Sequence, residues 1–182
     1  MNICLLTDIQ CIDISGSALA TQLTEEKVRQ SAFSVLNNNA VCSMATVTPE
    51  ARSHIHSAYF SYSLEYELFF LSNPNSVHCR NLKSNVSMAV TVFPATPTWG
   101  EPSVGIQLFG SAMEASGAAA ETAERSYGIR FPGFLNWKAE VGKTEMIHQY
   151  EFYRFETESF KILDERTFGD SVWVRASILR RN

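Results

Sequence analysis

The sequence predicts a mainly β, α+β protein in which an antiparallel barrel is flanked by helices. Apolar runs with the composition of strands follow one another closely, bounded by turns that contain Pro, Gly, Asn or Ser. Only two long segments show helical spacing, at residues 24 to 38 and 117 to 131. Because the strands are consecutive and do not alternate regularly with helices, an antiparallel barrel is favoured over a doubly wound sheet.

The elements before the middle of the chain are defined by capping and turn residues. Thr24 is a suitable N-cap for the first helix, and Glu25 and Glu26 lie in its first turn, where the helix dipole favours acidic groups. The segments 40 to 47 and 52 to 60 are rich in strand formers and flank the short turn "TPEA". We therefore expect a helix followed by a β-hairpin.

Further strands are predicted along the rest of the chain. They occupy residues 66 to 72, 86 to 93, 104 to 115, 150 to 157 and 160 to 165, with a short last strand around 171 to 176. Gly110 is expected where the sheet bends or another backbone passes closely. The helix at 117 to 131 is expected to end near Gly128 and to be stopped by Pro132. In all, about six to seven strands and two or three helices are expected.

Length and composition indicate a single soluble domain spanning residues 1 to 182. The chain is 45% hydrophobic and 19% charged, which is typical of globular proteins. Its net charge of -4 argues against nucleic acid as the main partner. No apolar run reaches the ~18 residues of a membrane span, and the first residues carry Asp8 and Asp13 rather than a basic start. A cytoplasmic protein without a membrane partner is expected.

The four cysteines are expected to be buried free thiols. Cys4, Cys11, Cys42 and Cys79 form no C-x-x-C pair and have no metal-ligand spacing. Disulfide bonds are therefore not predicted.

The strand at 52 to 60 places polar side chains on one face. The two-residue period puts Arg52, His54 and His56 together and turns Ser53 and Ile55 to the other face. An H-x-H pair binds metal when a third ligand is present, and the remaining histidines, His78 and His148, are distant in the sequence. No metal site is expected, and the two histidines fit either ligand contact or hydrogen bonding at a barrel rim.

The connection after residue 72 has the features of a phosphate cradle. A helix that begins near Ser76 presents free backbone N–H groups, and Ser72 and Ser76 add hydroxyl donors. Arg80 and Lys83 share a helix face, and Arg52 would approach from the neighbouring strand. The alternative is a solvated basic face. The sequence contains no G-x-G-x-x-G or P-loop motif of the usual nucleotide folds.

Three runs follow one another along the chain: "MATVTPEARSHIHSAYF", "LFFLSNPNSVHCRNLKSNVSMAVTVF" and "GIQLFGSAMEA". In order and spacing they resemble the FMN-binding split-barrel family that includes pyridoxamine 5'-phosphate oxidase. The matched core covers residues 24 to 115, after an N-terminal extension at 1 to 22. The helix and strands of 116 to 182 are similar to a little-characterised bacterial branch. The resemblance implies a six-stranded antiparallel split β-barrel with flanking helices, a homodimer, and FMN at the dimer interface.

The resemblance also assigns roles to single residues. It implies that the cofactor is contacted by the strand at 52 to 60, by the connection and helix that follow residue 71, and by the strand at 104 to 115. The residues concerned are Arg52, Ser53, His54, Ile55, Ser72, Ser76, His78, Arg80 and Gln107. His56 is the catalytic candidate, as a donor to the reduced flavin ring or to the substrate. The sequence departs from the family at Val77 and His78, where many members have Arg-Lys.

The resemblance implies a flavin-dependent oxidoreductase that acts on a small molecule. Two alternatives remain. Some members of the family bind haem or a deazaflavin instead, and His54, His56 or His78 would then be candidate axial ligands for haem. A barrel that binds a metabolite without any cofactor is the other alternative, because the phosphate clamp is altered.

Overall fold

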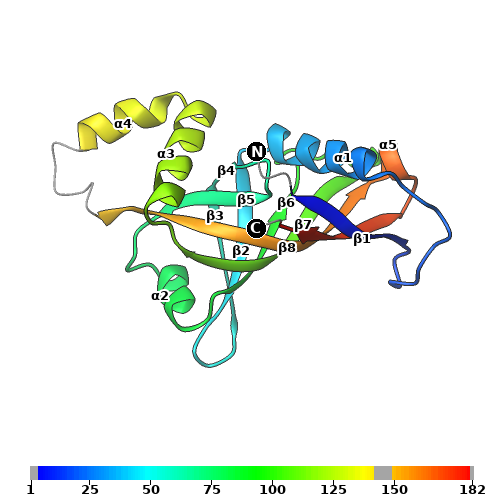
Figure 1. Cartoon of the computed structure of the whole chain (residues 1–182), viewed down its shortest axis with the longest axis horizontal. Coiled ribbons are helices and arrows are strands. Elements are labelled where there is room, and N and C mark those ends of the chain that lie inside the picture. The colour runs from blue at the N-terminus through cyan, green and yellow to red at the C-terminus, as the bar shows by residue number, and fades with distance from the viewer. Residues whose placement is uncertain (1–3, 142–148, 181–182) are drawn as a thin grey trace.

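The computed structural model describes residues 4–141 and 149–180, and its centre is one antiparallel sheet (Figure 1). The strands are β1 (Leu5–Ile12), β2 (Val41–Val47), β3 (Ser53–Tyr59), β4 (Ser61–Tyr62), β5 (Glu67–Ser72), β6 (Ser87–Val92), β7 (Val104–Glu114), β8 (Glu151–Asp164) and β9 (Trp173–Leu179). The helices are α1 (Glu25–Asn38), α2 (Val77–Ser84), α3 (Ala118–Arg130), α4 (Gly133–Val141) and the short α5 (Glu165–Phe168). The predicted mainly β class with flanking helices is confirmed.

The sheet curves into a barrel that is not fully closed, because in the described chain its edge strand β3 is hydrogen-bonded on one side only. Its main path runs β1-β9-β8-β7-β6-β2-β3, and β5 pairs with the first half of β8. On the other side β5 pairs with β4, through Ser61 opposite Phe69 and Tyr62 opposite Leu68. Within the described residues no ladder joins β3 to β5. The barrel therefore closes at β4 and is split beside β3.

The bend predicted at Gly110 is present. The register between β7 and β8 shifts after Phe109, so that Phe109 opposes Ser159 whereas Gly110 opposes Thr157. A Cβ atom at Gly110 would lie 2.0 Å from the backbone oxygen of Glu156. Only glycine permits this close approach of the two strands.

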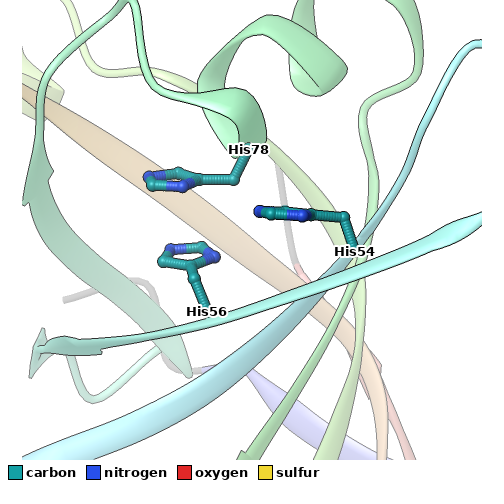
Figure 2. Close-up of side chains that lie close together, drawn as sticks. All are labelled: His54, His56 and His78. Carbon is teal, nitrogen blue, oxygen red and sulfur yellow. The ribbon is translucent and has the colours of Figure 1, made fainter.

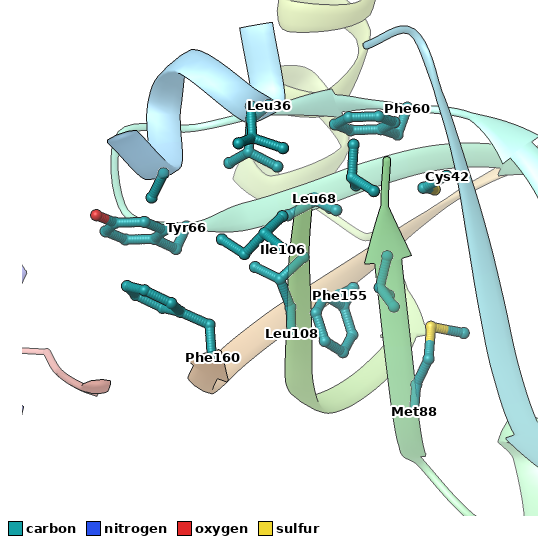
Figure 3. Close-up of a cluster of buried hydrophobic side chains, with 14 of the residues drawn as sticks. Leu36, Cys42, Phe60, Tyr66, Leu68, Met88, Ile106, Leu108, Phe155 and Phe160 are labelled. Carbon is teal, nitrogen blue, oxygen red and sulfur yellow. The ribbon is translucent and has the colours of Figure 1, made fainter. Parts of the chain in front are cut away.

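Apolar side chains from the sheet and from α1 fill the barrel. Figure 3 shows part of this cluster, in which Leu36 of α1 lies with Tyr66, Phe155 and Phe160. The first helix begins as predicted, because the side chain of Thr24 accepts a hydrogen bond from the backbone N–H of Lys27. All four cysteines are buried and free, as expected.

The helices lie on both sides of the sheet. In Figure 1, α1, α3 and α4 lie above the sheet, whereas α2 lies below it beside the projecting β2–β3 hairpin. Helix α3 agrees with the prediction but passes Gly128 and continues to Arg130. None of the helices in the described part of the chain is long and apolar enough to cross a membrane.

The expected six to seven strands are too few, since the sheet in the described part of the chain has nine. The segment 1 to 22, expected to be an extension, supplies β1, which pairs with β9. This strand has an irregular register between Thr7 and Gln10, and Asp8 has a positive φ of 52°, so the two-residue pattern is broken. The strands expected at 150 to 157 and 160 to 165 form one strand, β8, which continues through its bulge.

Candidate functional site

The β2–β3 hairpin determines where His54 and His56 lie. In its register, His56 opposes Met44 and His54 opposes Thr46, on the face that turns toward the barrel interior. The alternate residues face outward, and Ile55 is 71% exposed. The predicted separation of the two faces of β3 is confirmed.

Helix α2 brings a third histidine to the same face. Its N-cap is Ser76, whose hydroxyl oxygen accepts a hydrogen bond from the backbone N–H of Cys79 at 3.3 Å. Farther along the helix, Asn81 donates from Nδ2 to the hydroxyl of Thr46 on β2 at 3.0 Å, and both side chains are buried. This bond fixes α2 against the hairpin and directs His78, in the first turn, toward β3.

The three histidines form a compact cluster at the split of the barrel (Figure 2). One ligand nitrogen of each lies within 4.8 Å of the others. The rings of His56 and His78 stack with centroids 3.4 Å apart and an angle of 7° between their planes. The ring of His54 lies 6.4 Å from each of the other two rings. His78 is thus the third ligand candidate that the sequence did not place near the H-x-H pair; His148 lies outside the described residues.

The environment of His56 and His78 favours neutral rings. Burial, followed by the neighbouring His78 and His54, lowers the pKa of His56 from 6.5 to about 4. Burial and then His54 lower the pKa of His78 to about 4 as well. Both ring nitrogens of His56 are buried and have no hydrogen-bond partner in the described structure. A buried polar atom without a partner is costly, so His56 is a position where a ligand would be stabilising.

A triangle of polar atoms lies at the beginning of α2. His78 Nε2 is 2.7 Å from the hydroxyl oxygen of Ser72 and 3.0 Å from that of Ser76, and the two hydroxyl oxygens are 3.4 Å apart. Three groups that can all donate hydrogen bonds therefore meet beside the N-terminus of an α-helix. The structure brings together Ser72, Ser76 and His78 as the sequence predicted.

The two predicted arginines lie at the surface. Arg52 and Arg80 are both exposed. Arg80 donates from a guanidinium nitrogen to the backbone oxygen of Asn75, in the turn before α2. Neither arginine forms an ion pair with a carboxylate in the described part of the chain. Both side chains are therefore free to pair with an anion.

The remaining predicted contacts lie on the outer face of the barrel. Across the sheet, Gln107 of β7 pairs with Thr91 of β6, and Thr91 pairs with Ser43 of β2. Ser43 pairs in turn with Ser57 of β3. Residues directly opposite each other share a face, so Gln107 lies on the face of Ser53 and Ile55. The structure does not bring these three residues together with His54, His56 or His78.

Two aromatic residues beside the histidines were not predicted. Phe70 of β5 opposes Tyr153 of β8, and their rings stack at 5.4 Å. The ring of Phe70 also lies 6.1 Å from that of His56. The hydroxyl of Tyr153 is buried without a partner, and burial raises its pKa. Alternation along β8 marks Tyr153 as inward-facing, but only the pairing of β5 with β8 places it near the cluster.

Comparison with solved structures defines the class of fold. A haem-binding protein from Mycobacterium smegmatis is 13% identical, with a TM-score of 0.61 over 89% of this chain and 60% of that protein. A putative pyridoxamine 5'-phosphate oxidase from Listeria innocua is 14% identical, with a TM-score of 0.56 over 75% and 98% of the two chains. An FAD-binding protein from Mesorhizobium loti is 13% identical, with a TM-score of 0.53 over 94% and 99%.

These similarities show that the chain has the split-barrel fold, as the resemblance in the sequence implied. The chain spans 60% of the mycobacterial protein and also 60% of an Agrobacterium tumefaciens protein of unknown function, to which it is 20% identical with a TM-score of 0.60. No family model matches the sequence, and no curated protein has significant similarity to it. Because solved proteins of this fold include flavin-binding and haem-binding members, the fold by itself does not select the cofactor.

Proposed function

We propose that the protein binds FMN and is a flavin-dependent oxidoreductase that acts on a small molecule. The observation that carries this proposal is the triangle of Ser72, Ser76 and His78 at the beginning of α2. Hydroxyl and imidazole donors beside a helix N-terminus suit the terminal phosphate of a mononucleotide.

The residues around the triangle fit a phosphate group. The helix dipole and the hydroxyls of Ser72 and Ser76 favour an anion, and the guanidinium groups of Arg52 and Arg80 are without carboxylate partners in the described structure. His78, with a pKa of about 4, contributes an N–H donor but no charge at neutral pH. The two arginines are therefore the proposed source of positive charge.

His56 is the proposed catalytic residue, and its environment limits what it does. FMN, when bound, supplies the capacity to accept and donate hydride. With a pKa of about 4, His56 is neutral at physiological pH, so it donates a hydrogen bond rather than a full proton. Its ring is stacked against His78 and its nitrogens are buried. Contact with a substrate or with a cofactor ring therefore requires the His56 side chain to turn away from His78.

A homodimer with the cofactor at its interface is also proposed. Apolar side chains are exposed on the outer face of the β2–β3 hairpin, where Val41 opposes Tyr59 and Ile55 lies on the same face, four residues before Tyr59. Such side chains on neighbouring strands suit burial against a second copy of the chain, and the position of the cofactor at that interface rests on the resemblance in the sequence.

Absorbance spectroscopy tests the proposal. The purified protein is examined directly, and again after incubation with FMN and desalting. Retained flavin absorbance with a rise in melting temperature is expected, and Arg80→Ala should weaken FMN binding more than about 10-fold by removing a charge-assisted contact. Arg125→Ala, at an exposed arginine of α3 on the other side of the sheet from α2, is the matched control. Failure to retain FMN, together with an unchanged melting temperature, contradicts the proposal.

Haem is the second candidate cofactor, and the cluster of three histidines supports it, since imidazole is a common ligand of haem iron and the pKa values of His56 and His78 are lowered. The ring of His54 lies 6.4 Å from each of the other two, whereas His56 and His78 stack at 3.4 Å, which makes His54 the best-placed ligand of the three. Addition of haem should then produce a Soret band that shifts on substitution of His54 by alanine. A featureless spectrum with both cofactors would instead favour a metabolite-binding barrel without a cofactor.

A further inference from the structure

We infer that His54, His56 and His78 form a binding site for a divalent transition-metal ion of the zinc type. The inference does not depend on flavin binding. It rests on the arrangement of the three rings, on the unpaired nitrogens of His56, and on the groups that hold His78 in place (Figure 2).

The first support is convergence from two elements. His54 and His56 project from the same face of β3, and His78 approaches from the first turn of α2, so that the three side chains point toward one another. Their nearest ligand nitrogens lie within 4.8 Å of one another. Three nitrogens bound at about 2.0 to 2.1 Å in a tetrahedral site are separated by roughly 3.3 Å. The rings thus need to move closer by an amount that side-chain rotation provides.

The second support is independent of this spacing. Both nitrogens of His56 are buried without a partner in the described structure. Buried polar atoms are normally paired, and an unpaired one indicates a missing ligand, ion or water. The lone pair of an imidazole lies in the plane of its ring, so the parallel stack of His56 on His78 cannot itself satisfy these atoms. Metal binding would require the stacked rings to turn and would pair one nitrogen of His56 directly.

The third support is the way His78 is oriented. Its Nε2 lies within hydrogen-bond distance of the hydroxyls of Ser72 and Ser76, which leaves Nδ1 for a ligand. Metal-binding histidines are usually fixed in this way through their second nitrogen. The bond between Asn81 and Thr46 supports the helix one turn later. The site is therefore built on secondary structure rather than on loops.

The donor set selects the class of metal. Three imidazoles without a carboxylate suit Zn²⁺, Co²⁺, Ni²⁺ or Cu²⁺, whereas Mg²⁺ and Ca²⁺ prefer oxygen ligands. Three protein ligands leave a fourth position for water or a small anion, as in zinc sites that are open to substrate. A bound cation would add positive charge beside the serine triangle, where Val77 and His78 supply none.

Metal titration of the whole protein tests the inference. The protein is treated with a chelator, dialysed and titrated with Zn²⁺ by calorimetry in the absence of flavin. One ion per chain is expected. Loss of a residue that only hydrogen-bonds to a metal ligand typically weakens metal binding by about 10- to 100-fold. Substitution of His56 or His78, which are proposed as direct ligands, by phenylalanine should weaken Zn²⁺ binding by more than this. The control is Ser57→Ala, because Ser57 faces away from the cluster on the same strand and should leave the affinity unchanged.

Co²⁺ provides a second readout that needs no variant. Intense visible absorption from a four-coordinate, nitrogen-bound ion supports the site, whereas the weak bands of hydrated Co²⁺ overturn it. Zinc binding that persists in both phenylalanine variants, with their fold intact, also overturns it. Arg80→Ala separates this site from the proposed FMN site, since that change should weaken FMN binding and leave zinc affinity unchanged.

Discussion

Acidification should destabilise the protein through His56 and His78. Both pKa values are lowered from 6.5 to about 4 in the folded chain, because burial and neighbouring rings disfavour the charged form. The unfolded chain therefore binds more protons than the folded chain between these values. The contribution of each histidine is fully present above pH 6.5 and is lost as the pH falls toward 4.

The size of the effect follows from the two pKa values. Between about pH 7.5 and about pH 5, linkage gives a loss of roughly 2 kcal/mol for each histidine. Both residues are only half-buried, so solvent screening reduces this loss to about 1 kcal/mol each. Their repulsion of each other is part of the shift of His56, and the two contributions are not fully independent.

Urea denaturation at the two pH values, with a chelator present, measures the loss. His56→Phe should reduce the difference in unfolding free energy between the two pH values by about half, whatever its effect at a single pH. Packing changes caused by phenylalanine cancel in this difference, because they do not depend on pH. If His56→Phe keeps the full pH dependence of the wild type, the depressed pKa of His56 is refuted.

Three further outcomes are expected. Gly110→Ala should destabilise the protein by about 3 kcal/mol in urea, because its Cβ would lie 2.0 Å from a backbone oxygen, whereas Gly133→Ala, with open space around it, should not. Asn81→Ala should cost about 1 to 3 kcal/mol by leaving the buried Thr46 hydroxyl unpaired, and Thr46→Val added to it should recover part of that loss. The thiol of Cys42, whose pKa burial raises to about 12, should react with a thiol reagent only after unfolding; rapid reaction of the native protein at this residue would contradict its burial.

Local sequence signals were sufficient for most of the elements. Thr24 and Ser76 cap helices where the sequence placed them, because an N-cap depends on a few neighbouring residues. The two faces of β3 follow from the strand period alone. The proximity of Ser72, Ser76 and His78 could also be predicted, since all three residues lie within one short stretch of the chain.

Other features depended on pairings between distant segments. The strand β1 carries an irregular pattern, and it is held in place by its ladder with β9 at the far end of the chain. The register of β7 with β6 puts Gln107 on the outer face of the sheet, and its contact with a flavin ring stays a prediction. Strand register is set by contacts across the sheet, which a single sequence does not display.

The sequence by itself determined the split-barrel class, the hairpin with its two histidines, and the polar start of α2. The tertiary structure decided that these parts meet. The barrel remains open along β3, and the hydrogen bond from Asn81 to Thr46 holds α2 against that opening. His78 therefore stacks on His56, although the two residues are 22 positions apart in the sequence, as their numbers show. Sequence patterns report the local preferences of a segment, whereas a site shared by β3 and α2 depends on how the whole sheet closes.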